Sequence, residues 1–253
     1  VGTSSEKAAD VMRELYAPFA RTRSKLIVMG VHSAEMTKYA ANCMLATKIS
    51  FINEIANICE KVGADVRYGG SCFPKDVKAL IRTALDAGLK APLLQAVEDV
   101  NKHQKQHMAE IIENYFAPQG GVKGKTLALW GLAFKANTDD MREAASVDVI
   151  KRLTAEGMKV TAFDPVAADN ARRIFKDNDN VVIGNDQYEV LKGAQALLVI
   201  TEWNQFRNPD FDRVKEMLTA PIVFDGRNLY SPDTMARHGF AYFCIGRRAD
   251  GAR

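Results

Sequence analysis

The sequence predicts an α/β protein with a long-helix central domain followed by a doubly wound, mostly parallel, Rossmann-like sheet domain. Helical periodicity runs through most of residues 34–116, whereas six short apolar runs alternate with helical stretches after residue 124. Continuous apolar runs of this length are typical of parallel strands that are covered on both faces. With 253 residues, 47% hydrophobic and 26% charged, the chain has a globular composition, which excludes the disordered and fibrous classes.

Composition also excludes several kinds of partner. The net charge is only +3 and no basic stripe is interleaved with aromatic residues, so we expect no nucleic acid partner. No apolar run reaches membrane-spanning length and the first residues show no signal pattern, so we expect no membrane association and a cytoplasmic location. The four cysteines and the pair His103 and His107, which falls in a polar run, lack the spacing of a zinc site or a disulfide framework, so no metal is expected.

The first predicted helix covers residues 34–62, with Ser33 as its N-cap and Gly63 just past its end. Its apolar residues form more than one stripe, because Met44 and Phe51 fall outside the main one. A helix that is apolar on more than one side is usually buried between layers or subunits. We therefore expect a homodimer that forms through this helix.

Two further helices and a linker complete the first half. One helix begins near Lys75 and stops at Gly88, and the next opens at Pro92, which suits a first helical position, and runs to about Phe116. Residues 117–124, APQGGVKG, contain one proline and three glycines, which is the composition of a linker. This linker separates a predicted central domain, residues 34–117, from a second domain, residues 118–253.

The second half is predicted to contain six strands, within residues 126–134, 159–165, 180–184, 196–203, 220–228 and 240–246. In a doubly wound sheet, ligands bind outside the carboxyl ends of the strands, where the strand order reverses. The residues that this rule places at the ligand-binding edge are 134–142, Asp164, 201–204 and 225–228. The glycine-rich GxGxxG turn is absent from the chain, so we expect the sheet to bind a nucleotide in some other way.

A candidate nucleophile lies between the first two predicted helices. Gly69 and Gly70 let the backbone approach a ligand, and they precede Cys72, which stands just before a predicted helix. A thiol at a helix N-terminus and close to Lys75 lies in positive potential, which stabilises the thiolate. The alternative is a small buried packing residue, which is what most free cysteines are. The paired glycines before Cys72, and the Lys75-Asp76 pair after it, favour the nucleophile.

Two polar residues of the long helix form a second candidate group. Lys38 and Asn42 are four residues apart, so they project from the same face, in a mostly apolar stretch. A cation beside an amide donor could stabilise a developing oxyanion. The alternative is a solvated helix face, which the apolar surroundings weaken without removing it.

Cationic residues follow two of the predicted strands. Lys135 and Arg142 come after the first strand and Arg227 after the fifth. Lysine and arginine at strand ends suit phosphate oxygens, which arginine can bind through two parallel hydrogen bonds. Turn formation and helix capping favour the same residue types, so each segment alone allows either interpretation.

Four segments together are similar to a known family. Residues 34–66, 68–76 (YGGSCFPKD), 131–144 (GLAFKANTDDMREA) and 224–228 (FDGRN) resemble, in matching order, the UDP-glucose 6-dehydrogenases of the UDP-glucose/GDP-mannose dehydrogenase family. The resemblance implies NAD-dependent oxidation of UDP-glucose to UDP-glucuronate by two hydride transfers through a cysteine thiohemiacetal and thioester. The alternatives are a non-catalytic nucleotide-sugar-binding or dimerisation fragment, or a related GDP-mannose or UDP-N-acetylmannosamine dehydrogenase.

The resemblance also implies residue roles. Cys72 would be the nucleophile, Lys38 and Asn42 would stabilise the oxyanion, and Asp76 would assist the water step. The implied binding residues are Gly69, Phe134, Lys135 and Arg227 for UDP-glucose, and Lys75 and Arg142 for the phosphates of NAD.

The sequence departs from the family in two places. Residues 1–33 are expected to be a remnant of an N-terminal NAD-binding domain that is otherwise largely absent from the sequence. Arg67 alone stands where the family has a further loop between Val66 and Tyr68. A protein covalently as written is therefore expected to be inactive in NAD reduction.

Overall fold

The structure is a computed structural model that describes residues 1–19, 26–62, 74–86, 88 and 90–246, without the side chains of 54–62 and 74–76. The chain divides into two compact units, one formed by residues 1–48 and 72–98 and the other by residues 49–71 and 99–253. The predicted domain boundary in the linker, like the assignment of residues 1–33 to another domain, stays a prediction.

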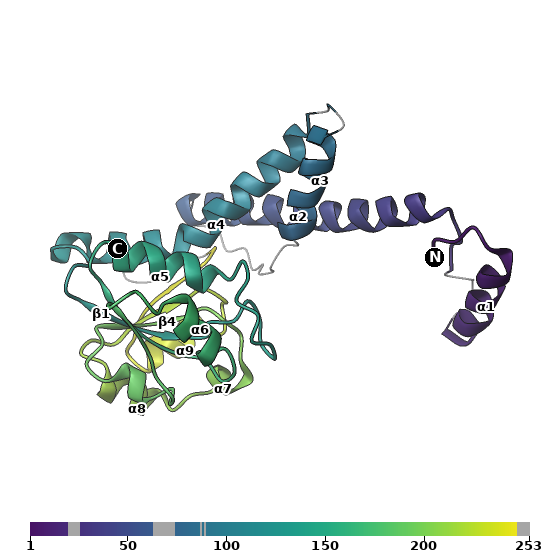
Figure 1. The fold of residues 1–253 in the computed structure, drawn as a ribbon. Coiled ribbons are helices and arrows are strands. Elements are labelled where there is room, and N and C mark those ends of the chain that lie inside the picture. The colour runs from purple at the N-terminus through teal and green to yellow at the C-terminus, as the bar shows by residue number, and fades with distance from the viewer. Residues whose placement is uncertain (20–25, 63–73, 87, 89, 247–253) are drawn as a thin grey trace. The chain divides into compact units, whose positions relative to one another are not determined.

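The first unit is helical. It contains α1 (Glu6–Tyr16), the short 3-10 helix η1 (Ala17–Phe19), α3 (Pro74–Asp86) and the first parts of α2 (Val31–Val62) and α4 (Pro92–Phe116) (Figure 1). Gly2 and Met29, on either side of α1, form a parallel bridge.

The three predicted long helices are confirmed, with one correction. α2 is a single 32-residue helix, but it begins at Val31, so Ser33 lies inside it and is not its N-cap. The Ser33 carbonyl accepts a hydrogen bond from the Thr37 hydroxyl at 2.7 Å, one helical turn later. Among the described residues, no helix is both long and apolar enough to cross a membrane.

The second unit is built on a six-stranded parallel sheet, which confirms the predicted fold class. The strands are β1 (Thr126–Trp130), β2 (Lys159–Phe163), β3 (Val181–Ile183), β4 (Ala196–Val199), β5 (Ile222–Asp225) and β6 (Ala241–Cys244). Their order is β3-β2-β1-β4-β5-β6, and every pairing is parallel. This is the doubly wound order, in which the direction of winding reverses between β1 and β4.

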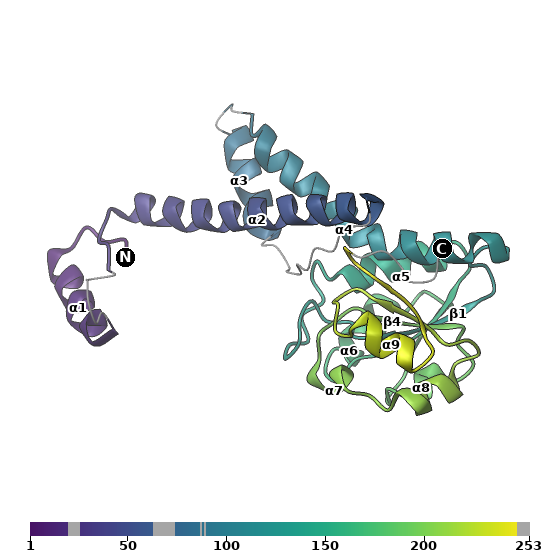
Figure 2. The same cartoon turned by 180° about the vertical axis from the view of Figure 1, so that it is seen from behind.

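Helices cover both faces of this sheet (Figures 1 and 2). One face packs against α4, α5 (Ala145–Ala155) and α6 (Ala168–Ile174). The other packs against η3 (Glu189–Leu191), α7 (Asn204–Arg207), α8 (Phe211–Met217) and α9 (Pro232–Arg237). The remaining 3-10 helix, η2 (Ala117–Gln119), ends at Gly120 in the linker.

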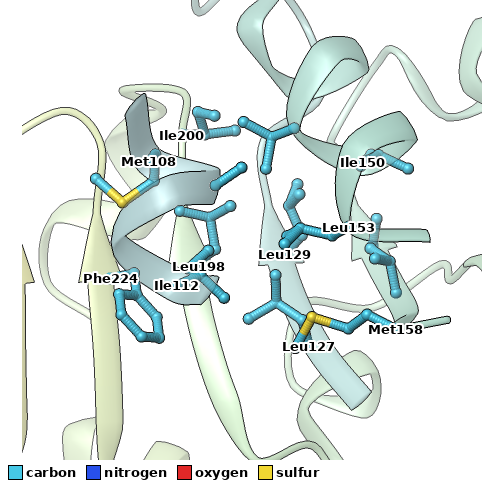
Figure 3. Packing of buried hydrophobic residues seen from close by; sticks show 14 of the residues in the cluster. Met108, Ile112, Leu127, Leu129, Ile150, Leu153, Met158, Leu198, Ile200 and Phe224 are labelled. Atoms are coloured by element: carbon cyan, nitrogen blue, oxygen red, sulfur yellow. The ribbon is translucent and has the colours of Figure 1, made fainter. Parts of the chain in front are cut away.

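Alternation along the strands divides the core between these two faces. Leu127 and Leu129 point to the α4–α5 side, where they belong to the same buried cluster as Met108 and Ile112 of α4 (Figure 3). Ala128 and Trp130 point to the opposite face. Full burial of a leucine side chain stabilises a fold by about 1.5–3 kcal/mol, so these layers dominate the stability of the unit. The C-terminal part of α4 therefore belongs to the core of the sheet unit.

An ion-pair cluster adds to the contact between α4 and α5. Arg152 of α5 donates to both carboxylate oxygens of Glu113, at 2.7 and 2.6 Å, and lies 3.2 Å from Glu110. Burial raises the pKa of Glu110. The hydrogen bond from Arg152 and the nearby His103 and His107 lower this pKa by more than burial raises it, so the net shift is downward. The bidentate geometry makes this pair more rigid than a single surface contact.

Candidate functional site

The site is the carboxyl edge of the sheet at the β1–β4 reversal. Gly131 follows β1 with φ 92°, and a Cβ there would lie 2.4 Å from Cβ of Thr201, which follows β4. Only glycine fits this approach. The Thr201 hydroxyl then donates to the carbonyl of Ala133 at 2.7 Å. The segments that follow the two central strands are thus fixed to each other.

Arg227, after β5, bridges these same segments. Its Nε donates to the carbonyl of Ile200 at 2.9 Å, and its Nη2 donates to the carbonyl of Phe134 at 3.0 Å. Glu202 Oε2 lies 3.1 Å from Nε, yet it accepts no hydrogen bond, because the Nε–H points at Ile200. The contact between Glu202 and Arg227 is therefore an ion pair without a hydrogen bond. Nη1 donates to no group within the described part of the chain, so it can donate to an anionic ligand.

A buried network supports the backbone of Arg227. Asp225, the last residue of β5, accepts from the Arg227 N–H at 2.9 Å, the Tyr230 N–H at 3.1 Å and the Tyr242 hydroxyl at 2.8 Å. Burial raises the pKa of the Asp225 carboxyl, and the hydrogen bonds from Arg227, Tyr242 and Tyr230 offset part of the rise. Burial also raises the pKa of Tyr230 and of Tyr242. The backbone of Arg227 is therefore held by a buried hydrogen-bond network centred on Asp225.

Phe134 and Lys135 begin the loop that follows β1. Phe134 is half-buried, and its N–H donates to the carbonyl of Asp140 at 2.8 Å, which closes the loop. Asn137 allows the turn with φ 62°, a value that asparagine adopts more readily than most residues. Lys135 is exposed, and in the described part of the chain no group pairs with its ammonium. Its charge is therefore available to a ligand at this edge.

Arg142, at the end of this loop, is 88% exposed. Its Nε and Nη2 donate to the two carboxylate oxygens of Asp140, at 2.9 and 2.7 Å. These hydrogen bonds raise the pKa of the guanidinium. Nη1 has no acceptor among the residues that the structure describes, which is compatible with the predicted contact to a dinucleotide phosphate.

The predicted catalytic residues belong to the other part of the chain. Lys38 is exposed and Asn42 half-buried on α2, four residues apart on one face. Gly69 and Cys72 lie outside the described residues, as do the side chains of Lys75 and Asp76. α3 begins at Pro74, two residues after Cys72, as the predicted helix start requires. The convergence of these groups around the sulfur stays a prediction.

Two family models match the chain. Residues 128–232 match the UDP binding domain of the UDP-glucose/GDP-mannose dehydrogenase family, and residues 32–68 and 66–103 match the central domain of the same family. Together these matches cover more than half of the chain. The chain belongs to the UDP-glucose/GDP-mannose dehydrogenase family. The resemblance found in the sequence is confirmed, and the carboxyl edge falls within the UDP binding domain.

Curated relatives of this family are similar over almost the whole chain. A UDP-glucose 6-dehydrogenase of Pseudomonas aeruginosa is 41% identical over 99% of this chain, and one of Rhizobium meliloti is 40% identical over 98%. The chain spans 60% of the length of each.

Solved structures of the family share the fold. A UDP-glucose dehydrogenase from Pyrobaculum islandicum superposes with a TM-score of 0.76 at 30% identity, covering 96% of this chain and 57% of that one. An NDP-N-acetyl-D-galactosaminuronic acid dehydrogenase from Methanosarcina mazei superposes with a TM-score of 0.75 at 25% identity, covering 98% and 57%. The family fold therefore extends over both units of this chain.

The family comparison also bears on the segment around Arg67. The central-domain match falls into two parts that meet at residues 66–68. The alignment with the Pseudomonas relative runs over 276 positions against a chain of 253 residues, so that relative has residues without a counterpart here. The break in the central-domain match falls where the loop is predicted to be missing, and the missing loop itself stays a prediction.

The sequence predicts residues 201–204 at the edge of the sheet but indicates no role for Glu202 or Trp203. Glu202 pairs with Arg227, and the Trp203 indole donates to Asp164 at 3.2 Å. The sequence feature that could have identified them is a glutamate and a tryptophan directly after a buried strand, because a large aromatic residue is unusual in a surface turn. Which groups they contact depends on the order of the strands, which is a tertiary property.

Proposed function

We propose that this chain is the cysteine-bearing and nucleotide-sugar-binding part of an NAD-dependent UDP-glucose 6-dehydrogenase, which oxidises UDP-glucose to UDP-glucuronate. The observation that carries the proposal is the guanidinium of Arg227, held by the carbonyls of Phe134 and Ile200 at the reversal point of a sheet whose sequence matches a UDP binding domain. The curated relatives that bear the name of this enzyme support the choice of sugar.

Substrate recognition is assigned to the carboxyl edge. Arg227 is only partly exposed, so its charge acts in a less solvated environment than that of a surface arginine. Lys135 adds a second, exposed charge on the neighbouring loop. Two cations beside a half-buried aromatic residue, Phe134, suit a diphosphate joined to a planar base and a sugar.

The chemistry is assigned to Cys72. Oxidation of the C6 alcohol gives an aldehyde, and the Cys72 thiolate adds to its carbon, forming a C–S bond while the oxygen takes a proton. Loss of a hydride from C6 and of the hydroxyl proton leaves a thioester. Water then adds to the thioester carbon, the C–S bond breaks, and the sulfur leaves as thiolate with release of the acid. Lys38 and Asn42 would stabilise the oxyanions, and Asp76 would take a proton from the water.

NAD is the proposed acceptor of both hydrides. This chain would contribute Lys75 and Arg142 to the phosphates of the cofactor, and the exposed Nη1 of Arg142 is compatible with that role. The sequence contains no GxGxxG turn, so the remaining contacts to the dinucleotide are not assigned to this chain.

Homodimerisation through α2 is the second part of the proposal. Met44 and Phe51 are 59% and 60% exposed, and Met36, Tyr39 and Leu45 are exposed along the same helix. Apolar side chains gathered on one element favour a protein interface over solvent. Sedimentation should give a dimer at micromolar concentration, and Phe51→Glu should shift it toward monomer. Val182→Glu changes an equally exposed residue of β3 and should leave the dimer intact; a wild-type monomer would contradict the proposal.

Calorimetric titration of the 253-residue chain tests the nucleotide-sugar assignment directly. We expect binding of UDP and UDP-glucose, with GDP-mannose at least about tenfold weaker, and Arg227→Gln should weaken UDP-glucose binding by about 10- to 100-fold, the usual size of a charged hydrogen bond. Arg237→Gln is the matched control, because it removes an exposed arginine at the end of α9. Absence of UDP binding by the wild type would refute the proposed function.

A further inference from the structure

Asp164 is the first residue after β2, and its carboxylate is buried, with the whole residue 2% exposed. One oxygen, Oδ2, accepts from the backbone N–H of Leu132 at 2.7 Å and of Ala133 at 3.0 Å, and from the Trp203 indole at 3.2 Å. A buried carboxylate is costly unless donors replace its water. Here three donors converge on a single oxygen, and they come from the segments after β1 and β4.

The other oxygen, Oδ1, binds the chain that enters α6. It accepts from the N–H of Val166 at 3.0 Å and of Ala167 at 2.8 Å. A helix cap alone would need only these two contacts. The three additional bonds at Oδ2 are not explained by capping, because they fix segments that are more than 30 residues away along the chain.

The backbone that Asp164 holds leads directly into the ligand-binding edge. The carbonyls of Leu132 and Ala133 are fixed as well, by the hydroxyls of Ser146 at 2.6 Å and of Thr201 at 2.7 Å. Leu132 and Ala133 are therefore each held through both the backbone N–H and the backbone carbonyl. Phe134 follows at once, and its carbonyl accepts from Arg227. A shift of the held peptides would be passed on to the arginine.

We propose that Asp164 is the positioning residue of the nucleotide-sugar site. It does not touch the ligand; it fixes the peptides that place Phe134, Lys135 and, through the Phe134 carbonyl, Arg227. This inference rests on the proposed function, because it assumes that UDP binds at this edge. A residue with a purely structural role would change the stability of the fold without changing the affinity for UDP in the folded protein.

The test combines hydrogen exchange with UDP titration on the whole 253-residue chain. Asp164→Asn keeps the size of the side chain but replaces one carboxylate oxygen with an NH₂ group. That group cannot accept the N–H hydrogen bonds that the oxygen accepts. We expect the amides of Leu132 and Ala133 to exchange about tenfold faster, and UDP to bind about tenfold more weakly, since a lost charged acceptor has about this effect. Trp203→Phe removes one donor of the five and should weaken UDP binding by about two- to fivefold.

Thr161→Val is the matched control. It removes a partly buried hydrogen bond to the Val190 carbonyl, 2.7 Å long, from the middle of β2. We expect it to lower the thermal midpoint while leaving both the exchange of the Leu132 amide and the UDP affinity unchanged. If Asp164→Asn does not fold, Trp203→Phe decides: exchange and affinity equal to wild type would overturn the inference.

The outcomes separate this inference from the proposed function. Unchanged exchange at Leu132 and Ala133 in Asp164→Asn would overturn the positioning role whether or not UDP binds. Faster exchange with unchanged UDP affinity would also overturn it, because the role would then be structural only. A wild type that binds no UDP would refute both the proposed function and the affinity part, whatever the exchange rates.

Discussion

The long helix α2 and the parallel sheet bury their apolar residues in different ways. Strands β1, β4 and β5 are buried along nearly their whole length by helices of the same unit. In α2, Cys43, Ala46 and Ile49 are buried, whereas Met44 and Phe51 remain largely exposed. The strands of the sheet are thus covered within one chain, whereas α2 carries apolar surface that a single copy does not cover.

The two regions also differ in how deeply their polar residues are buried. At the carboxyl edge, Asp164, Thr201 and Asp225 are all buried, and each has hydrogen-bond partners. A closed network of this kind holds a site in place before a ligand arrives. On α2, by contrast, Lys38 is exposed to solvent. The predicted binding edge is thus held in place by buried hydrogen bonds, whereas Lys38 of the predicted oxyanion group lies on an exposed part of α2.

The largest expected effect comes from truncating a leucine to alanine in the sheet, compared with the same change in α2. Leu198→Ala in β4 removes a fully buried side chain and should lower the free energy of unfolding by about 3 kcal/mol. Leu45→Ala on α2 removes an exposed one and should cost less than about 0.5 kcal/mol in dilute solution. Urea unfolding measures both. A Leu45→Ala loss that grows with protein concentration would identify α2 as an interface, and equal losses at both positions would break the comparison.

The next effect concerns the contact between α4 and α5. Arg152→Met should cost about 2 kcal/mol, because it leaves Glu113 and Glu110 partly buried without their partner. The pKa of Glu110 is lowered in the folded state, so its contribution is present above the unfolded value and lost as pH falls through the folded one. The difference between wild type and variant should therefore shrink as pH falls from about 5 to about 3.

The control for that measurement is Arg82→Met. Arg82 pairs with Asp86 on the surface of α3, and surface pairs contribute about 0–1 kcal/mol. A loss at Arg82 as large as that at Arg152 would show that partial burial does not distinguish the two ion pairs.

A smaller, pH-dependent effect is expected at Asp225. Its pKa is raised in the folded state, so the folded protein binds more protons than the unfolded chain, and the stability contributed by this group is lost as pH rises through the folded value. Each unit of pKa difference corresponds to about 1.4 kcal/mol. Relative to Asp225→Asn, the wild type should become less stable as pH rises above about 4, the ordinary pKa of an aspartate, as measured by denaturant unfolding. A pH-independent difference would contradict the assigned direction.

The last prediction concerns the proposed nucleophile. Cys72 should be alkylated about tenfold faster at neutral pH than the buried Cys43 and Cys244, because the positive potential predicted at its helix N-terminus would stabilise the thiolate. UDP-glucose should protect it. Peptide mass spectrometry after timed labelling measures each thiol, and equal slow labelling of all the cysteines would count against an activated nucleophile.

The sequence by itself determined the elements and their class. The three long helices and all six strands were predicted from periodicity, because a helix at 3.6 residues per turn and a buried strand leave different apolar patterns. Gly157 follows α5 with φ 84°, a left-handed conformation that favours glycine just after a helix. The start of α2 was misplaced, since Val31 and His32 carry no start signal and a serine two residues later looked like a cap.

Strand order, and with it the contacts of the site, was decided only by the tertiary structure. A sequence shows that Asp164, Trp203 and Arg227 each follow a strand, but not that β1 lies between β2 and β4. Only that arrangement brings the Asp164 carboxylate to the peptides after β1, and Arg227 to the Phe134 carbonyl. The physical reason is that hydrogen bonds across a sheet edge join residues far apart in the chain, whereas periodicity and turn chemistry are properties of neighbouring residues.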